Sequence, residues 1–260
     1  MKLHHTAIGP TGAIPILLVH GLYGQGRNLG AQARRLAETR RVVSVDLRNH
    51  GDSPQGERAD YPALAEDLAD LIADLGGPVD LVGHSMGGKA AMVLALTRPD
   101  LVRRLVVMDI APLAYDHDQT GYIDAMEALD LGSVTRRSEA DRQLAAHVPQ
   151  PGIRAFLLQN LDLKAAPPVW RLNLPVLRAA MGQITGWPEG LPAEAFPGKV
   201  MALRGAKSDY VDAAGEDALR QFFPQVGIVT LKEAGHWLHA DAPEAVAETL
   251  VAFLGDGSEG

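Results

Sequence analysis

The sequence predicts an α/β fold, with a mostly parallel central sheet, helices on both faces and one helical insertion. Three observations predict it. Short apolar, β-branched runs alternate with stretches that carry apolar residues at helical spacing, which is typical of a parallel sheet. Several of these runs are apolar at nearly every position, as expected for strands covered on both faces. One long segment, from about residue 114 to residue 195, lacks strand signal, which indicates a helical insertion.

The predicted elements follow one another from residue 15 to residue 254. On their short apolar runs, we expect strands at 15–20, 42–46, 79–83, 105–109, 199–205 and 227–233. Apolar residues that recur every three or four positions predict helices at 28–38, 64–75, 85–97, 213–222 and 243–254. Because helices separate most consecutive strands, those strands are expected to run parallel.

The insertion is expected to be built from short helices. From about residue 114 to residue 195, helical spacing predicts four of them, at 122–129, 136–147, 152–161 and 176–184. We expect residues 1–113 and 196–260 to form the core and 114–195 to form a cap. Long insertions in enzymes often form lids, although a helical extension far from any site is the alternative. Four residues could line an acyl pocket or belong to ordinary core packing: Phe156, Leu158, Trp170 and Trp187.

Composition excludes several classes of function. A net charge of −8 argues against a nucleic-acid partner, because phosphate-backbone affinity comes from clustered Lys and Arg. The chain has no Cys, which excludes a disulfide framework, a thiolate metal site and a cysteine nucleophile. No apolar run approaches the roughly 20 residues of a membrane span. The first residues also lack the apolar core of a secretory signal, so we expect a cytoplasmic protein without a membrane span.

The most informative motif is Gly83-His84-Ser85-Met86-Gly87, a G-x-S-x-G sequence between a predicted strand and a predicted helix. This context predicts a nucleophile elbow, in which a serine occupies a sharp, strained turn. The residues two before and two after the serine must lack side chains that would collide, and both are glycine. Ser85 is therefore the candidate nucleophile.

A serine hydroxyl needs a neighbouring base, and His236 is the best candidate. It follows the last predicted strand, and in this arrangement the histidine comes after both the serine and the acid in the chain. His20 is expected to shape a turn, and the side chain of His84 to point away from the pocket. His239 lies three residues after His236, a spacing that can bind metal, but no acidic cluster completes such a site. A structural hydrogen bond is the expected role of His239.

The acid that orients His236 is ambiguous from the sequence. Asp109 ends the strand after the elbow, whereas Asp209 follows the next predicted strand. Both positions face the loops where the histidine arrives. We favour Asp109 and keep Asp209 as the rival.

Attack on a carbonyl creates an oxyanion, which needs two preorganised donors. We expect the backbone amide of Met86, directly after the nucleophile, to be one of them. The other is expected in the loop after the first buried strand, at the amide of Leu22.

That same loop has a second interpretation. Gly24-Gln25-Gly26 follows a strand, and Asp46 lies about 20 residues further on, as in a dinucleotide-binding fingerprint. The fingerprint needs glycine where Leu29 stands, and nucleotide binding would leave Ser85 without a role. We therefore expect no nucleotide cofactor. The polar loop at 48–53 is expected to be a structural turn without a catalytic role.

Together these residues resemble the α/β-hydrolase superfamily, and more narrowly the small bacterial YbfF-type serine esterases and their mitochondrial relatives. The resemblance covers nearly the whole chain. It depends on His20-Gly21-Leu22-Tyr23-Gly24, Asp46-Leu47-Arg48-Asn49-His50-Gly51, Gly83-His84-Ser85-Met86-Gly87-Gly88-Lys89, Asp109-Ile110-Ala111-Pro112, Phe156-Leu157-Leu158 with Asn160, Trp170-Arg171-Leu172-Asn173, and Gly235-His236-Trp237 with His239.

The resemblance implies an α/β-hydrolase fold and a serine carboxylesterase that acts on short acyl esters and acyl thioesters. It also implies Ser85, Asp109 and His236 as the catalytic triad. Members of this group often lack an acid where Asp209 stands, so this chain departs from them there.

The function predicted from the sequence is hydrolysis of a small-molecule ester through an acyl-enzyme, without cofactor or metal. Acyl transfer or carbon–carbon bond hydrolysis on the same triad is one alternative. A ligand-binding receptor on a hydrolase scaffold is another. The sequence does not indicate the oligomeric state.

Overall fold

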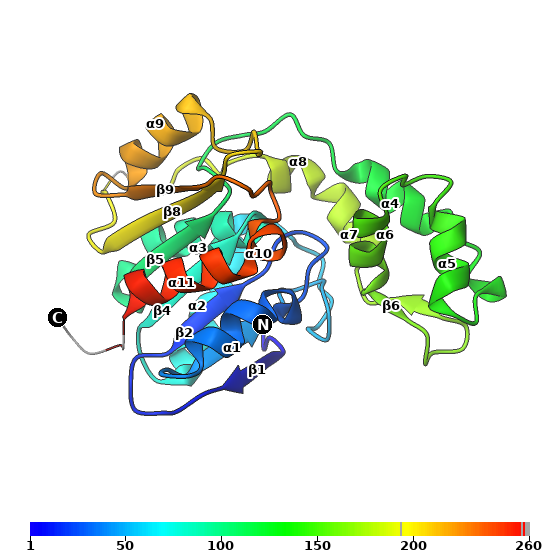
Figure 1. The fold of residues 1–260 in the computed structure, drawn as a ribbon, viewed down its shortest axis with the longest axis horizontal. Helices are drawn as coiled ribbons and strands as arrows, with labels where there is room; N and C mark the ends of the chain where they lie inside the picture. Colours follow the sequence, from blue (N-terminus) through cyan, green and yellow to red (C-terminus); the bar gives the residue numbers. More distant parts are fainter. Residues whose placement is uncertain (193, 256, 258–260) are drawn as a thin grey trace.

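The computed structural model describes residues 1–192, 194–255 and 257, and a seven-stranded sheet lies at its centre (Figure 1). In spatial order the strands are β1 (His5–Ile8), β3 (Val42–Val45), β2 (Ile16–Val19), β4 (Val79–His84), β5 (Val102–Met108), β8 (Lys199–Gly205) and β9 (Gly227–Leu231). β1 pairs with β3 in the antiparallel direction, and the other neighbours pair in parallel. The predicted mostly parallel sheet is confirmed.

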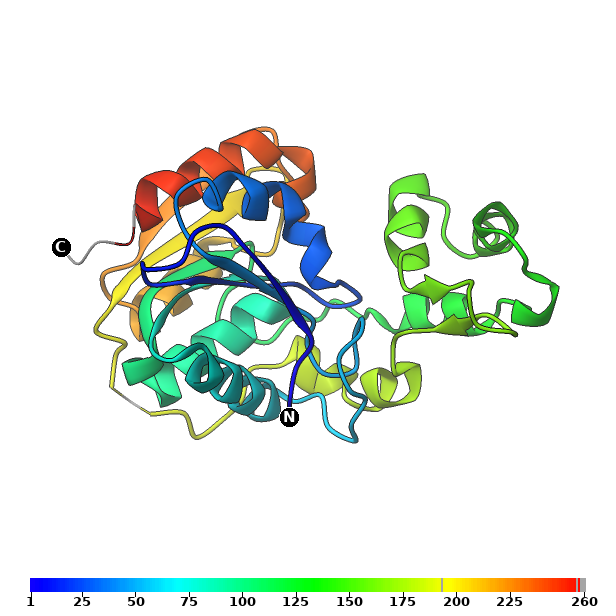
Figure 2. The same cartoon turned by 90° about the horizontal axis from the view of Figure 1, so that it is seen from below.

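Helices cover both faces of this sheet, and Figure 2 shows the two helical layers with the sheet between them. One layer holds α1 (Gly30–Leu36) and α11 (Pro243–Leu254), which pack against each other. The other holds α2 (Tyr61–Leu75), α3 (Met86–Thr97) and α9 (Ala213–Phe222).

Strand β2 shows why this sheet is apolar throughout. Ile16 and Leu18 belong to the core beneath α1 and α11, whereas Leu17 and Val19 belong to the core beneath α2 and α3. Successive strand residues face opposite layers, so all four are fully buried. Each such burial contributes about 1.5–3 kcal/mol.

The described residues between β5 and β8 form five α-helices: α4 (Thr120–Glu127), α5 (Arg137–Leu144), α6 (Pro151–Leu158), α7 (Leu174–Ala179) and α8 (Met181–Thr185). In Figures 1 and 2, α4 to α7 stand beside the sheet as a separate lobe. The segment was expected to lack strands, but β6 (Leu161–Asp162) pairs with β7 (Val169–Trp170). The helix expected at 176–184 is two helices, because the chain turns at Ala180.

Three further elements differ from the expectations. β1 was not predicted, because this edge strand has no apolar alternation and is mostly exposed. α10 (Leu238–Asp241) was missed because it is a single turn. α2 begins three residues earlier than expected, where the Asp60 side chain accepts a hydrogen bond from the Ala63 amide (3.0 Å).

The parallel strands all end at the same edge of the sheet, and the loops at this edge carry the candidate site residues. Ligands bind at the carboxyl ends of strands in open α/β sheets, so this edge is where a site is expected. Among the described residues, no helix combines the length and apolar character that a membrane span requires.

Candidate active site

Ser85 occupies a strained backbone position between β4 and α3. Its φ is 51° and its ψ is −122°, values that a residue with a side chain rarely adopts. A Cβ at Gly83 would lie 2.4 Å from the Gly87 carbonyl oxygen, and one at Gly87 would lie 2.3 Å from the His20 carbonyl oxygen. The predicted need for glycine at both positions is confirmed.

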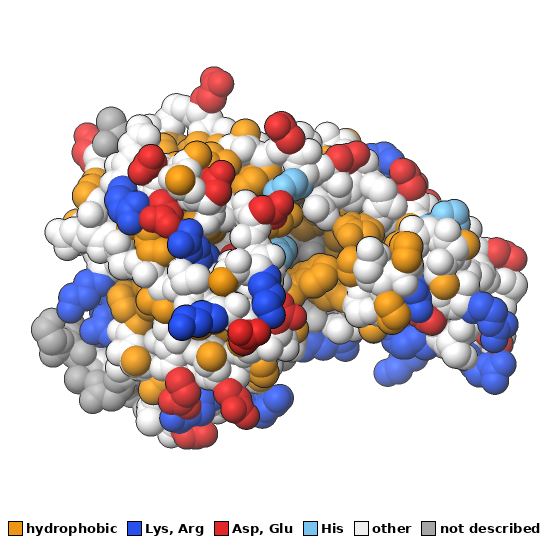
Figure 3. Space-filling view, turned by 45° about the horizontal axis from the view of Figure 1, so that its top comes forward, with side chains coloured by type: hydrophobic (Ala, Val, Ile, Leu, Met, Phe, Trp, Pro, Cys, Tyr) orange, Lys and Arg blue, Asp and Glu red, His pale blue; other side chains and the backbone are white. Residues whose placement is uncertain are grey.

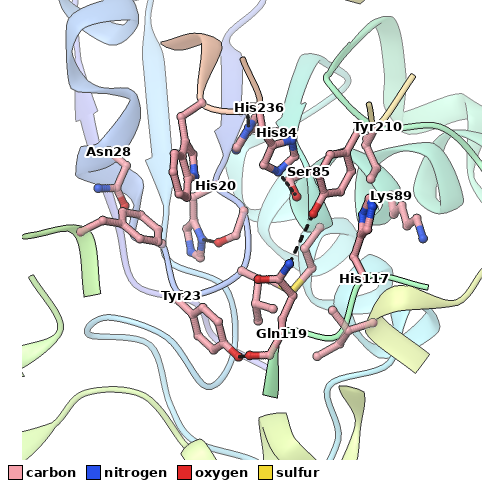
Figure 4. A pocket seen from close by; sticks show the side chains of 18 of the residues that line it. His20, Tyr23, Asn28, His84, Ser85, Lys89, His117, Gln119, Tyr210 and His236 are labelled. Atoms are coloured by element: carbon pink, nitrogen blue, oxygen red, sulfur yellow. Dashed lines mark hydrogen bonds between the residues drawn. The ribbon is translucent and has the colours of Figure 1, made fainter. Parts of the chain in front are cut away.

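Three side chains from different loops meet at this turn, and Figure 4 shows two of them, Ser85 and His236, in contact. The Nε2 atom of His236 lies 3.1 Å from Ser85 Oγ, and its Nδ1 atom lies 2.8 Å from Asp109 Oδ2. Asp109 directly follows β5 and is fully buried, with a positive φ of 51°. The sheet thus brings a hydroxyl, an imidazole and a carboxylate into one chain of hydrogen bonds.

The Asp109 carboxylate is held by two further donors. Its Oδ1 atom accepts the Gly205 amide at 2.8 Å, and its Oδ2 atom accepts the Ser208 hydroxyl as well as His236. These donors satisfy the oxygens of the buried carboxylate and hold it in one orientation toward His236.

Asp209 lies apart from this arrangement. Its side chain is 83% exposed, and it pairs with His117 Nε2 at 3.7 Å. The structure therefore brings one of the two candidate carboxylates to His236 and leaves the other at the surface.

The other candidate histidines have different partners. His20 Nε2 accepts the Leu47 amide at 3.0 Å, as expected for a residue that shapes a turn. His84 was expected to point away from the pocket, but its ring lines the pocket wall, and its Nε2 lies 2.8 Å from the His236 carbonyl oxygen. Burial holds the pKa of His84 well below its usual value, so it is a neutral donor there.

His239 is buried and packs its ring edge-on against His84, with ring centroids 4.6 Å apart. We expected the His239 side chain to make a structural hydrogen bond. For the Nδ1 atom this prediction is wrong, because Nδ1 is buried and has no hydrogen-bond partner among the described residues. The one group of metal-ligand type within the described residues lies elsewhere, at His4, Asp46 and Asp52.

Leu22 and Met86, whose backbone amides are the expected oxyanion donors, line the pocket together with Ser85. Met86 is the first residue of α3, so its amide has no acceptor within the helix. The Leu22 amide lies in the loop after β2 and has no acceptor among the described residues, whereas the next amide, that of Tyr23, donates to His50 Nε2 (3.2 Å). Both predicted donors are therefore free for a ligand.

A known family matches nearly the whole of this chain. The Alpha/beta hydrolase family matches residues 16–249. The chain belongs to the α/β hydrolase family. This confirms the resemblance drawn from the sequence motifs.

Three proteins similar to this α/β hydrolase are named as esterases or as a lipase. The mouse (Mus musculus) sn-1-specific diacylglycerol lipase ABHD11 is 41% identical over 264 residues, which cover 98% of this chain and 85% of the relative. Esterase YbfF of Escherichia coli is 37% identical over 263 residues, which cover 98% of this chain and 100% of the relative. The solved structure of a marine microorganism esterase superposes with a TM-score of 0.92 at 32% identity. The match covers 97% of this chain and 99% of the esterase chain.

The pocket of this α/β hydrolase lies between the core and the insertion and has a volume of about 240 Å³. Figure 3 shows hydrophobic and histidine side chains at the hollow between the two parts. Ile153, Phe156 and Leu157 of α6 line it.

Of the four apolar residues considered from the sequence, Phe156 lines the pocket. Trp170 donates to the Met126 carbonyl, and Trp187 packs on Phe222, so these belong to packing, as does buried Leu158.

No role in the site was predicted for several residues that the structure brings to it. Asn160, fully buried after α6, donates from Nδ2 to the Tyr23 carbonyl (2.8 Å) and accepts from Gln25 Nε2 (2.9 Å), which ties the insertion to the Leu22 loop. His50, placed in a loop without a catalytic role, supports the same loop through the Tyr23 amide. Burial lowers the pKa of His50 to about 3, so its Nε2 stays an acceptor.

Lys89 was not predicted to be a site residue either. It lies one turn after Ser85 on α3, is buried, and donates to the carbonyls of Thr185 (2.9 Å) and Gly186 (2.6 Å) at the end of α8. Its ammonium lies 4.6 Å from the centroid of the Tyr115 ring. Lys89 therefore joins the serine-bearing helix to the insertion.

Proposed function

We propose that this α/β hydrolase is a serine carboxylesterase that cleaves short-chain acyl esters through an acyl-enzyme. The observation that carries the proposal is the hydrogen-bonded chain from Ser85 Oγ through His236 to the buried Asp109 carboxylate. An imidazole in this position removes the proton of the hydroxyl as it attacks, which converts a weak nucleophile into an effective one.

In the first half of the reaction, Ser85 Oγ attacks the ester carbonyl while His236 Nε2 takes the hydroxyl proton. Asp109 stabilises the imidazolium that forms and fixes its tautomer. The amides of Leu22 and Met86 donate to the oxyanion of the tetrahedral intermediate. The intermediate collapses when the carbon–oxygen bond to the alcohol breaks, and His236 returns the proton to the leaving alcohol.

In the second half, water replaces the alcohol. His236 takes a proton from the water as its oxygen attacks the acyl-enzyme carbonyl. The bond to Ser85 Oγ then breaks, the serine regains its proton from His236, and the carboxylic acid leaves. No cofactor is needed for any of these steps.

The geometry supports Asp109 as the acid and makes Asp209 the weaker candidate. Asp109 contacts His236 and has no exposed surface, whereas the Asp209 side chain is 83% exposed and pairs with His117. An exposed carboxylate is screened by water and orients a partner poorly.

We further propose that residues 114–195 act as a cap that selects the acyl group. The residues of α6 that line the pocket are apolar, and they share it with Ser85. The pocket volume of about 240 Å³ is below the roughly 300–1,000 Å³ that is usual for drug-sized ligands, which favours a short acyl chain. The names of the relatives support ester substrates; a thioester would react by the same steps.

The test is a chain-length series of p-nitrophenyl esters and matching acyl thioesters with the wild type and Ser85→Ala. We expect turnover on the short esters, falling as the chain lengthens, and loss of turnover in Ser85→Ala. Product analysis with and without added alcohol distinguishes hydrolysis from acyl transfer. Binding of the esters without release of acid by the wild type would contradict the proposal and favour a receptor.

A further inference from the structure

Tyr210 lies in the loop after β8, and its ring covers one face of the His236 imidazole. The two ring centroids are 3.8 Å apart and the planes differ by 17°. A ring stacked this closely restricts rotation of the imidazole out of its plane. The stack therefore restricts the orientation of the imidazole, and with it the direction in which Nε2 points at Ser85 Oγ.

The backbone of Tyr210 is fixed on both sides by groups of the same site. Its amide donates to Ser208 Oγ at 3.3 Å, and Ser208 itself donates to Asp109. Its carbonyl accepts the Tyr115 hydroxyl at 2.7 Å, and that hydroxyl accepts the Ala111 amide at 2.8 Å. Hydrogen bonds through Ser208 thus connect the residue that carries the stacked ring to the Asp109 carboxylate.

The hydroxyl of Tyr210 points into the pocket toward Gln119, as Figure 4 shows. It accepts a long hydrogen bond of 3.4 Å from Gln119 Nε2, and its own hydrogen has no acceptor among the described residues. Burial raises the pKa of Tyr210 to about 12, so the hydroxyl keeps its proton at neutral pH. A donor without an acceptor inside a substrate pocket is available to the ligand.

We propose that Tyr210 performs two tasks in this site: its ring holds the His236 imidazole in plane, and its hydroxyl donates a hydrogen bond to an oxygen of the bound ester. This inference rests on the proposed esterase function. It adds a residue that contacts both the general base and the substrate.

Two substitutions separate the tasks. Tyr210→Phe keeps the ring and removes the hydroxyl, whereas Tyr210→Leu removes both. On the best ester of the series, we expect kcat/KM to fall about tenfold in Tyr210→Phe, which is the usual effect of one lost hydrogen bond. In Tyr210→Leu we expect a loss of at least about 100-fold, because the base also loses its position.

A spectroscopic readout tests the ring task without kinetics. Protons of the His236 imidazole over the Tyr210 ring are shifted upfield by its ring current in the NMR spectrum. We expect that shift in the wild type and in Tyr210→Phe, and its loss in Tyr210→Leu. The His84 ring also lies near that of His236, with centroids 5.0 Å apart, so nuclear Overhauser cross-peaks between the His236 and Tyr210 ring protons of the wild type test the stack itself, even if Tyr210→Leu fails to fold.

Unchanged kcat/KM in Tyr210→Phe would overturn the hydroxyl task. Equal kcat/KM in the two variants, or a wild-type spectrum without the upfield shift, would overturn the ring task. In both cases the wild type still hydrolyses esters and Ser85→Ala does not. Failure of the esterase proposal is distinguishable, because the wild type itself would then release no acid.

Discussion

At the scale of single residues, the site depends on two strained positions. Ser85 and Asp109 both have a φ of 51°, and each directly follows a strand of the sheet. The G-x-S-x-G motif made the first position predictable, because the glycines show where the chain must turn tightly. No motif marks the second. Asp109 and Asp209 both follow strands at the same edge, and only the structure shows that the carboxylate of Asp109 reaches His236 while that of Asp209 is exposed.

Replacing each carboxylate by its amide tests this difference. We expect Asp109→Asn to lower kcat by on the order of 10⁴-fold, because the amide favours the wrong imidazole tautomer and cannot stabilise its charged form. Asp209→Asn is the matched control and should stay near the wild type. A severe loss in Asp209→Asn with normal Asp109→Asn would reverse the assignment of the acid.

The glycines of the elbow lead to a second prediction at this scale. In Gly87→Ala the new Cβ would lie 2.3 Å from the His20 carbonyl oxygen, which the backbone can relieve only by moving. We expect a loss of about 2–4 kcal/mol in the free energy of unfolding. Gly121→Ala in α4 meets nothing within 4 Å and should be neutral or slightly stabilising. Urea denaturation of both variants measures this; equal stabilities would contradict the account of the elbow.

At the scale of elements, the long periodic segments were predictable and the short ones were not. The parallel strands and the helices that cover them follow from apolar runs and helical spacing. The two-residue strands β6 and β7 and the single turn α10 are too short to have a period. Contacts between elements that are distant in the chain could not be predicted from the sequence either. The sequence around Lys89 predicts an apolar helix. Only the structure shows that the Lys89 ammonium donates hydrogen bonds to carbonyls at the end of α8.

Lys89 gives a pH-dependent prediction for this contact. Burial lowers its pKa to about 7, against about 10.4 in an unfolded chain. Between these values the unfolded state binds one proton more than the native state, so stability rises with pH in this window. We expect the free energy of unfolding of the wild type, relative to Lys89→Met, to increase by on the order of 2 kcal/mol from pH 7 to pH 9. Urea denaturation at several pH values measures it, and parallel curves for the two proteins would contradict the burial of a titrating ammonium.

At the scale of the whole molecule, the site forms because the parallel sheet ends its strands at one edge and the insertion covers that edge. Ser85, Asp109 and His236 come from the ends of β4, β5 and β9. The insertion contributes Asn160 to the Leu22 loop and the α6 side chains to the pocket. The chain order and the alternation of elements predicted this arrangement. The shape of the pocket and the orientation of Tyr210 depend on side-chain packing across distant segments, which no local pattern encodes.

The central claim is that the Ser85 hydroxyl, in its strained turn, is activated by His236. Its most direct test is to treat the folded protein with a fluorophosphonate and to locate the adduct by peptide mass spectrometry. We expect one adduct on the wild type, at Ser85, a much slower reaction in His236→Ala, and none in Ser85→Ala. A wild-type protein that stays unmodified, or that carries the adduct on another residue, would contradict the account.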